Sequence, residues 1–325
     1  MAEPGAKRKR TEGVLPTIST VDATLVRSQI WMPYGDIILQ AESTLFRVNR
    51  DVLAQQSSVF CDMFSIPQPP NEPTVDGCPV VHVSDKAKDW KMLFGVLYNS
   101  FRYYNAALPF NILAPMLRLG RKYDFSAAKD NAVWRIRFEF PGKLEAWSGV
   151  SAELTKIGPC QLTDLLCLTY ECGVTSSIPA LAFCCLREQT LEYLLTEIQH
   201  DDGSRSTLPD HIRLTLAIAL ERIASFQRAT FAWLEDASVI PHHSCTTQMK
   251  CTNQRRTMHH DLTFLGGNEL VRCYGLDDWN DDWEDEFCVV CSGAGETAFS
   301  KSRKMVWEAL PMFFGLPGWK DLKDD

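Results

Sequence analysis

The sequence lacks long hydrophobic runs, and this absence argues against the protein classes that depend on them. No apolar stretch approaches the ~20 residues that a membrane-spanning helix requires, so we expect no membrane partner. The basic N-terminal residues MAEPGAKRKR are not followed by an apolar segment, so we expect no secretory signal. The expected location is intracellular, cytoplasmic or nuclear. The 12 cysteines are then expected to be buried thiols or metal ligands rather than disulfides.

The common catalytic signatures are also missing. There is no phosphate-binding loop, no nucleophile elbow and no His-Glu-x-x-His pair, and no spacing of serines, histidines and acids singles out a triad. GAGETA, from Gly293 to Ala298, formally matches a dinucleotide-binding fingerprint. No second strand with an acidic residue follows it, so a glycine-containing turn is the favoured interpretation. We therefore expect a protein that is not an enzyme.

Positive charge is scarce relative to negative charge, and the net charge is -8. This balance argues against a protein that wraps nucleic acid over its whole surface, and we expect no direct nucleic-acid partner. The one basic cluster, Lys7 to Arg10, has two interpretations. It is either a short nuclear-import signal or a solubilising charge on a tail.

The chain has 325 residues, a length that corresponds to about two domains, and its residue patterns divide it into four segments. We expect an α+β fold in which short strands capped by helices precede a mostly α-helical region. The predicted segments are a flexible N-terminal tail (1–33), an α+β domain (34–140), a helical region (150–236) and a C-terminal segment (237–325) with cysteines, histidines and acidic residues. The C-terminal segment is expected to finish with a short helix that ends at Pro311.

The α+β segment opens with a predicted hairpin. GDIILQAE and LFRV are rich in strand formers and are separated by a short polar turn. Asn49 is expected to cap the next helix through its side chain, and Asp85 the helix that follows the strand VVHV. Two further amphipathic helices are predicted before Pro141.

Three stretches of this segment resemble the BTB/POZ domain family: LFRVNRDVLAQQSSVFCDMF, VVHVSDKAKDWKMLFGVLY and LRLGRKYDF. The resemblance covers about residues 34–140, under half the chain, and departs from the family at Asn49, where a histidine is usual. The whole layout, with its terminal LP…GLPGW, is similar to BTB-containing proteins of mushroom-forming fungi.

The resemblance implies a non-catalytic adaptor or scaffold that binds proteins through apolar surface. Family members dimerise or recruit partners such as cullin ubiquitin-ligase scaffolds or transcriptional corepressors. An alternative is a nuclear transcription-associated regulator that uses Lys7 to Arg10 for import.

Two more specific expectations follow from the resemblance. Asp36 and Arg50 match a charged pocket that the family's symmetric dimer buries, so they are the expected interface residues; the alternative is that Asp36 caps a strand and Arg50 is exposed. Cullin binders of the family usually carry a hydrophobic-x-Glu signature after the helix that ends here at Phe64. Glu72 follows Pro70-Asn71 instead, so we expect weak or no cullin binding.

The strongest metal signal is Cys288-Val-Val-Cys291, because two thiolates three residues apart can face one ion. Cys245 and Cys251 are expected to complete a tetrahedral structural zinc site. The substitute ligands are His242, His243, His259, His260 and Cys273. In the alternative interpretation Cys288 and Cys291 are core thiols beneath the last helix.

The segment 238–292 shows little apolar periodicity, so a metal is expected to close it as one loop. Within it, seven acids lie between Asp277 and Glu286 and flank Trp279 and Trp283. A solvated acidic loop is the favoured interpretation. The alternative is a partner-binding segment that the tryptophans anchor and the acids steer toward a basic partner.

Overall fold

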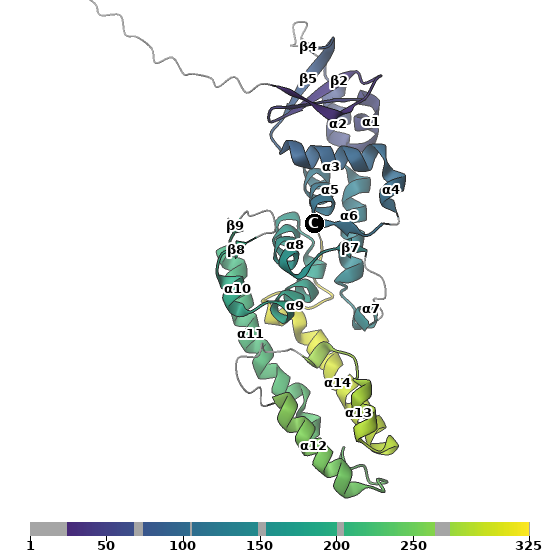
Figure 1. Ribbon diagram of the computed structural model, residues 1–325, viewed down its shortest axis with the longest axis vertical. Helices are drawn as coiled ribbons and strands as arrows, with labels where there is room; N and C mark the ends of the chain where they lie inside the picture. Colours follow the sequence, from purple (N-terminus) through teal and green to yellow (C-terminus); the bar gives the residue numbers. More distant parts are fainter. Residues whose placement is uncertain are drawn as a thin grey trace, which may run out of the picture.

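A small sheet lies at one end of the molecule, and helices form the rest (Figure 1). The computed structural model describes residues 25–67, 74–104, 106–148, 154–199, 205–263 and 274–324. The fold is α+β, as predicted. In the part of the chain so described, no helix combines the length and apolarity that crossing a bilayer requires.

The sheet has five strands in the order β1-β3-β2-β5-β4. The predicted hairpin is confirmed: β2 and β3 are antiparallel, with Leu39 opposite Phe46, and the predicted strand VVHV lies in β5, parallel to β2. The strands are β1 (Val26–Trp31), β2 (Ile37–Ala41), β3 (Thr44–Val48), β4 (Thr74–Val75) and β5 (Cys78–Val83).

Strand β1 lies in the segment predicted to be a flexible tail up to residue 33, and that prediction is wrong for residues 26–31. The strand pairs in parallel with β3 at the edge of the sheet and has no fully buried residue. Backbone pairing holds it there together with only two apolar contacts, of Ile30 and Trp31, which explains why the hydrophobic periodicity did not reveal it.

The first helices pack an aromatic core against the sheet. Trp90, Phe94 and Phe125 are at most 1% exposed, and the ring of Phe60 lies 6.0 Å from that of Trp90. The helix predicted after Asn49 is in fact two, separated at Ser57. The helices are α1 (Arg50–Gln56), α2 (Ser58–Ser65), α3 (Ala87–Tyr98), α4 (Ser100–Tyr104), α5 (Phe110–Tyr123), α6 (Ser126–Glu139) and α7 (Leu144–Ser148).

The first backbone N–H groups of α1 and α3 bond to acids from the hairpin rather than to the predicted caps. An Oδ of Asp36 accepts the N–H of Arg50 at 2.7 Å, and an Oε of Glu42 accepts that of Ala87 at 2.9 Å. The side chain of Asn49 donates to the carbonyl of Tyr34 instead. Asp85 likewise makes no cap, because its carboxylate accepts hydrogen bonds from Lys122 and Tyr123.

One hydrophobic core continues from the sheet into the following helices. The buried Arg135 of α6 helps to join them, since its guanidinium donates to the carbonyls of Tyr103, Ala106 and Leu154 beside the short β6–β7 pair. The elements here are β6 (Leu108–Pro109), β7 (Thr155–Lys156), α8 (Pro159–Cys172), α9 (Ile178–Glu188), α10 (Leu191–Leu195), β8 (Ile198–Gln199) and β9 (Arg205–Ser206).

The last helices extend away from the sheet as an arm (Figure 1). The arm consists of α11 (Asp210–Thr230), α12 (Gln248–Thr263), α13 (Asp281–Glu286) and α14 (Val289–Phe313). The residues after α14 turn back toward the sheet end, where Trp319 stacks on Trp307 at 5.0 Å and Asp324 accepts the N–H of Ser176.

Three predictions for this region are wrong. The segment 238–292 is not one loop, because it contains α12 and α13. The terminal helix is not short, since it begins at Val289 and includes Pro311. GAGETA forms no turn, because it lies inside α14. Helix α12 escaped detection because its buried face is narrow: only Cys251, Met258 and Leu262 are buried in the core, and polar side chains dominate the rest.

Candidate metal centre

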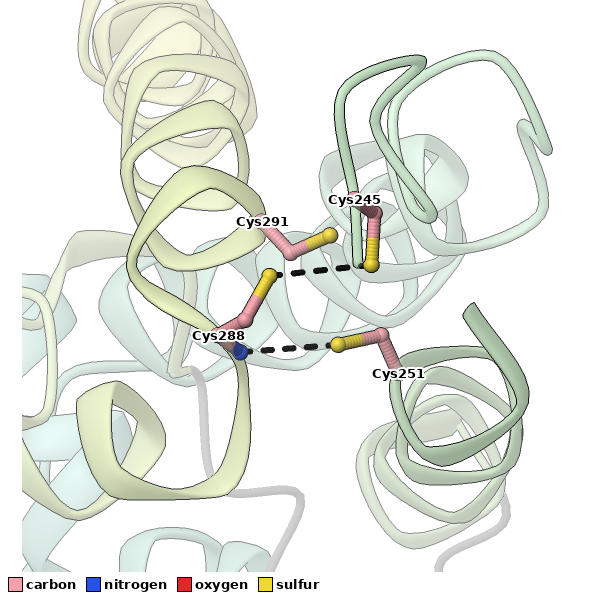
Figure 2. Close-up of side chains that lie close together, drawn as sticks. All are labelled: Cys245, Cys251, Cys288 and Cys291. Carbon is pink, nitrogen blue, oxygen red and sulfur yellow. Dashed lines mark hydrogen bonds between the residues drawn. The ribbon is translucent and has the colours of Figure 1, made fainter. Parts of the chain in front are cut away.

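Two cysteine pairs lie at the starts of two helices of the arm. Cys245 belongs to the turn before α12 and Cys251 to its first turn, whereas Cys288 precedes α14 and Cys291 is in its first turn. Each pair therefore combines a cysteine ahead of a helix with one in the helix. Figure 2 shows the four side chains pointing toward one another from the two sides.

The four Sγ atoms all lie within 4.8 Å of one another. The Sγ atoms of Cys288 and Cys245 are 3.6 Å apart. A tetrahedral zinc ion with Zn–S bonds of about 2.3 Å holds its sulfurs about 3.8 Å apart. All four cysteines are free thiols, since a disulfide needs an S–S bond of about 2.05 Å. The cluster thus has the size of a four-thiolate site.

Backbone N–H groups point at two of the sulfurs. The N–H of His242 donates to Sγ of Cys291 at 3.3 Å, and that of Cys288 donates to Sγ of Cys251 at 3.4 Å. The hydroxyl of Thr247 lies 3.4 Å from Sγ of Cys251. Nothing in the sequence pattern indicated Thr247, because its place beside the sulfurs depends on the turn that precedes α12.

The pKa values of Cys288 and Cys291 are shifted in opposite directions. The backbone N–H of Cys291 and the neighbouring thiols lower the pKa of Cys288 to about 6, which favours its thiolate. Burial raises the pKa of Cys291, which favours its thiol. The fold explains this difference in pKa: Cys288 lies at the positive N-terminal end of α14, whereas Cys291 is buried in the core.

The cysteines belong to a second, smaller hydrophobic core, separate from the one under the sheet. Phe231, Ile240 and Phe299 are at most 1% exposed there, and Cys251 and Cys291 are fully buried beside them. Gly295 lies against this core so closely that a Cβ atom would be 3.1–3.2 Å from side-chain atoms of three residues. Those three residues are Trp279, Ile240 and Trp233.

The substitute histidine ligands lie outside the cluster. In the described part of the chain, the only group with metal-ligand geometry consists of the four cysteines. The rings of His242 and His243 lie 3.9 Å apart, His259 contacts Glu235, and His260 contacts Asp261. Cys273 lies outside the described residues.

The tryptophans of the acidic run pack inward, which makes the partner-anchor interpretation wrong for them. The ring of Trp279 lies 5.1 Å from that of Trp283, and both contact Phe299. The solvated-loop interpretation is also wrong for residues 281–286, which form α13. Two acids before that helix are paired within the chain: Asp277 lies 3.8 Å from Arg187, and Asp278 lies 2.7 Å from Arg303.

The structure brings Asp36 and Arg50 together, but through the backbone. The carboxylate of Asp36 accepts the N–H of Arg50, while the guanidinium of Arg50 lies 5.0 Å over the ring of Phe64. Within the described residues the two side chains form no ion pair. Glu72 and the basic cluster at Lys7 to Arg10 lie outside the described residues.

Comparison with known proteins adds no relative to this description. No family model matches the chain, and the search of curated proteins found no match either. The function must therefore be argued from the residues themselves.

Proposed function

We propose that the protein is a non-catalytic interaction protein of BTB type that self-associates through its sheet end. One observation carries the proposal: the residues that resemble the BTB/POZ family fold as the β2–β3 hairpin, helices α1 and α2, strands β4 and β5, and helices α3 to α6, with the short β6 before α5. These elements share one core built around Trp90 and Phe94. The resemblance implies protein binding, and no catalytic spacing argues for a reaction.

The edge of the sheet supports self-association. Among the described residues, β1 pairs on one side only, with β3, so its other side offers unpaired backbone groups to a second strand. Large apolar side chains are exposed on and beside this edge, at Leu25, Val26 and Tyr34. A free edge with apolar neighbours is suited to a partner copy.

The position of Asp36 fits the same surface. Its side chain is exposed and is held against the start of α1 by the bond to the Arg50 N–H. Cullin recruitment is not part of the proposal, because the degenerate sequence around Glu72 argues against it. The nuclear-regulator alternative depends on Lys7 to Arg10, and no structural observation favours it.

Light scattering on the full chain tests the proposal. We expect a mass of about twice 36.8 kDa at tens of micromolar, a working range for weak association. Val26→Glu, at a residue 58% exposed on β1, should return the monomer mass, because it places a charge on the pairing edge. Met249→Glu is the matched control: Met249 is 80% exposed on the arm, and its replacement should leave the mass unchanged. A monomeric wild-type chain would contradict the proposal.

A further inference from the structure

We propose that Cys245, Cys251, Cys288 and Cys291 bind one structural Zn²⁺ that joins the start of α12 to the start of α14. The proposal does not depend on self-association or on the BTB resemblance. It is based on sulfurs that converge from two separate segments: Cys251 and Cys288 are 37 residues apart in the chain, and Cys245 and Cys288 are 43 apart.

The donor set favours a soft, tetrahedral metal ion such as Zn²⁺. Four sulfurs within 4.8 Å of one another match a soft, tetrahedral ion, whereas magnesium and calcium require oxygen ligands. Four protein ligands leave no open coordination position for water or substrate. The site is therefore structural rather than catalytic.

The surroundings suit the charge of such a centre. Four thiolates and one Zn²⁺ carry a net charge of −2, which needs compensation in a buried place. The first turns of α12 and α14, helices of 16 and 25 residues, supply positive dipole ends. The N–H groups of His242 and Cys288 donate to two of the sulfurs. Such outer bonds orient metal ligands and hold their charge.

Ordinary buried thiols of the same chain look different. Cys184 and Cys185 are also buried, but they lie side by side in the middle of α9 and belong to no group with metal-ligand geometry in the described residues. They fill the main core as small apolar residues. The four cysteines of the arm instead direct their sulfurs at one another, within 4.8 Å.

The centre holds together a part of the arm with little apolar surface. The small core of the arm contains only three buried residues of α12, one of which is Cys251. The other two, Met258 and Leu262, lie toward the far end of the helix. At its N-terminal end, α12 meets the start of α14 through these cysteines, since Sγ of Cys251 accepts the N–H of Cys288 (Figure 2).

Zinc content of the full-length chain, purified without chelator, tests the proposal. We expect one Zn²⁺ per chain by elemental analysis, and less than a tenth of that in Cys251→Ser and Cys288→Ser variants. Cys61→Ser is the matched control, since Cys61 is exposed on α2 far along the chain from the cluster, and it should retain one Zn²⁺. Retention of full zinc by both cluster variants would overturn the proposed ligands.

Two measurements on the wild-type chain keep the test independent of how well the variants fold. Exchange with Co²⁺ should produce the intense thiolate-to-metal charge-transfer and visible bands of a tetrahedral four-sulfur site. Thiol titration of the unfolded chain in chelator should find all 12 thiols. A folded chain without zinc, a cobalt spectrum typical of nitrogen or oxygen ligands, or a titration that finds disulfides among these cysteines would each overturn the proposal.

Discussion

The Sγ atoms of Cys245 and Cys288 lie 3.6 Å apart, although 43 residues separate the two cysteines in the chain. This contact joins helices α12 and α14, whose remaining shared core is small. The stability of the arm is therefore expected to depend on the metal that binds these sulfurs. The stability of the sheet end is expected not to depend on it.

Removal of metal by a chelator should loosen the arm locally. Structural zinc contributes on the order of 10 kcal/mol in small zinc-finger peptides, so its loss should increase amide exchange in residues 242–263 and 288–292. Hydrogen exchange followed by mass spectrometry measures this. Protection of β2, β3 and β5 should stay the same within error, since these strands belong to the main core. Equal loss in both regions would contradict a local role.

Gly295 should be intolerant of any side chain, whereas Gly293 should accept one. Both lie in α14, where replacing glycine by alanine favours the helix by about 1 kcal/mol. At Gly295 the added Cβ meets two tryptophans and Ile240 at 3.1–3.2 Å, while at Gly293 nothing lies within 4 Å. The free energy of unfolding of Gly295→Ala is therefore expected to be about 1–3 kcal/mol lower than that of Gly293→Ala. Chemical denaturation of the two variants measures this difference. It reports the effect of packing alone, because the gain in helix propensity from glycine to alanine is the same at both positions.

Arg135 should be among the most sensitive residues of the main core. Its side chain is 1% exposed and donates to three carbonyls, and each buried acceptor left without a donor costs about 1–3 kcal/mol. Arg135→Met should thus lower the free energy of unfolding by roughly 3–5 kcal/mol. Arg137→Met on the same helix is the control: the Arg137 side chain is 52% exposed and its partner Asp324 keeps the hydrogen bonds from Ser176, so the cost should be about 1 kcal/mol or less. Similar losses in the two variants would contradict the assigned role of Arg135.

Tyr123 should make the protein lose stability at alkaline pH. Burial and the bond from its hydroxyl to Asp85 raise its pKa above the ordinary value of 10.0. The folded state keeps this proton where the unfolded state releases it. The stabilisation is therefore complete below pH ~10 and is lost as the pH rises above it. Burial also raises the pKa of Tyr98 and of Tyr170, so Tyr123→Phe should reduce the loss but not abolish it.

Urea unfolding at several pH values between 8 and about 11 measures the effect. Tyr34→Phe is the control for the loss of a hydroxyl group, because Tyr34 is 91% exposed and its replacement should leave the stability at neutral pH unchanged. An identical alkaline slope in wild type and Tyr123→Phe would contradict the prediction.

Local pattern was enough to predict the hairpin and the helical character of most of the chain. The strand formers of 37–48 and the apolar stripe around Trp90 are properties of residues that are near in sequence, so they are visible without a structure. The candidate metal ligands were visible too, since two cysteines three residues apart already suggest that they bind one metal ion.

Only the tertiary structure decided the features that depend on distant partners. The caps of α1 and α3 come from Asp36 and Glu42, so the local candidates Asn49 and Asp85 were wrong. Strand β1 is held by backbone pairing with β3, which leaves no apolar signature. Which of the cysteines and histidines meet was equally undetermined, because the fold brings the starts of α12 and α14 together and so places the sulfurs side by side and the imidazoles elsewhere. Short-range periodicity is a property of the sequence, whereas the choice of partner across dozens of residues is a property of the folded core.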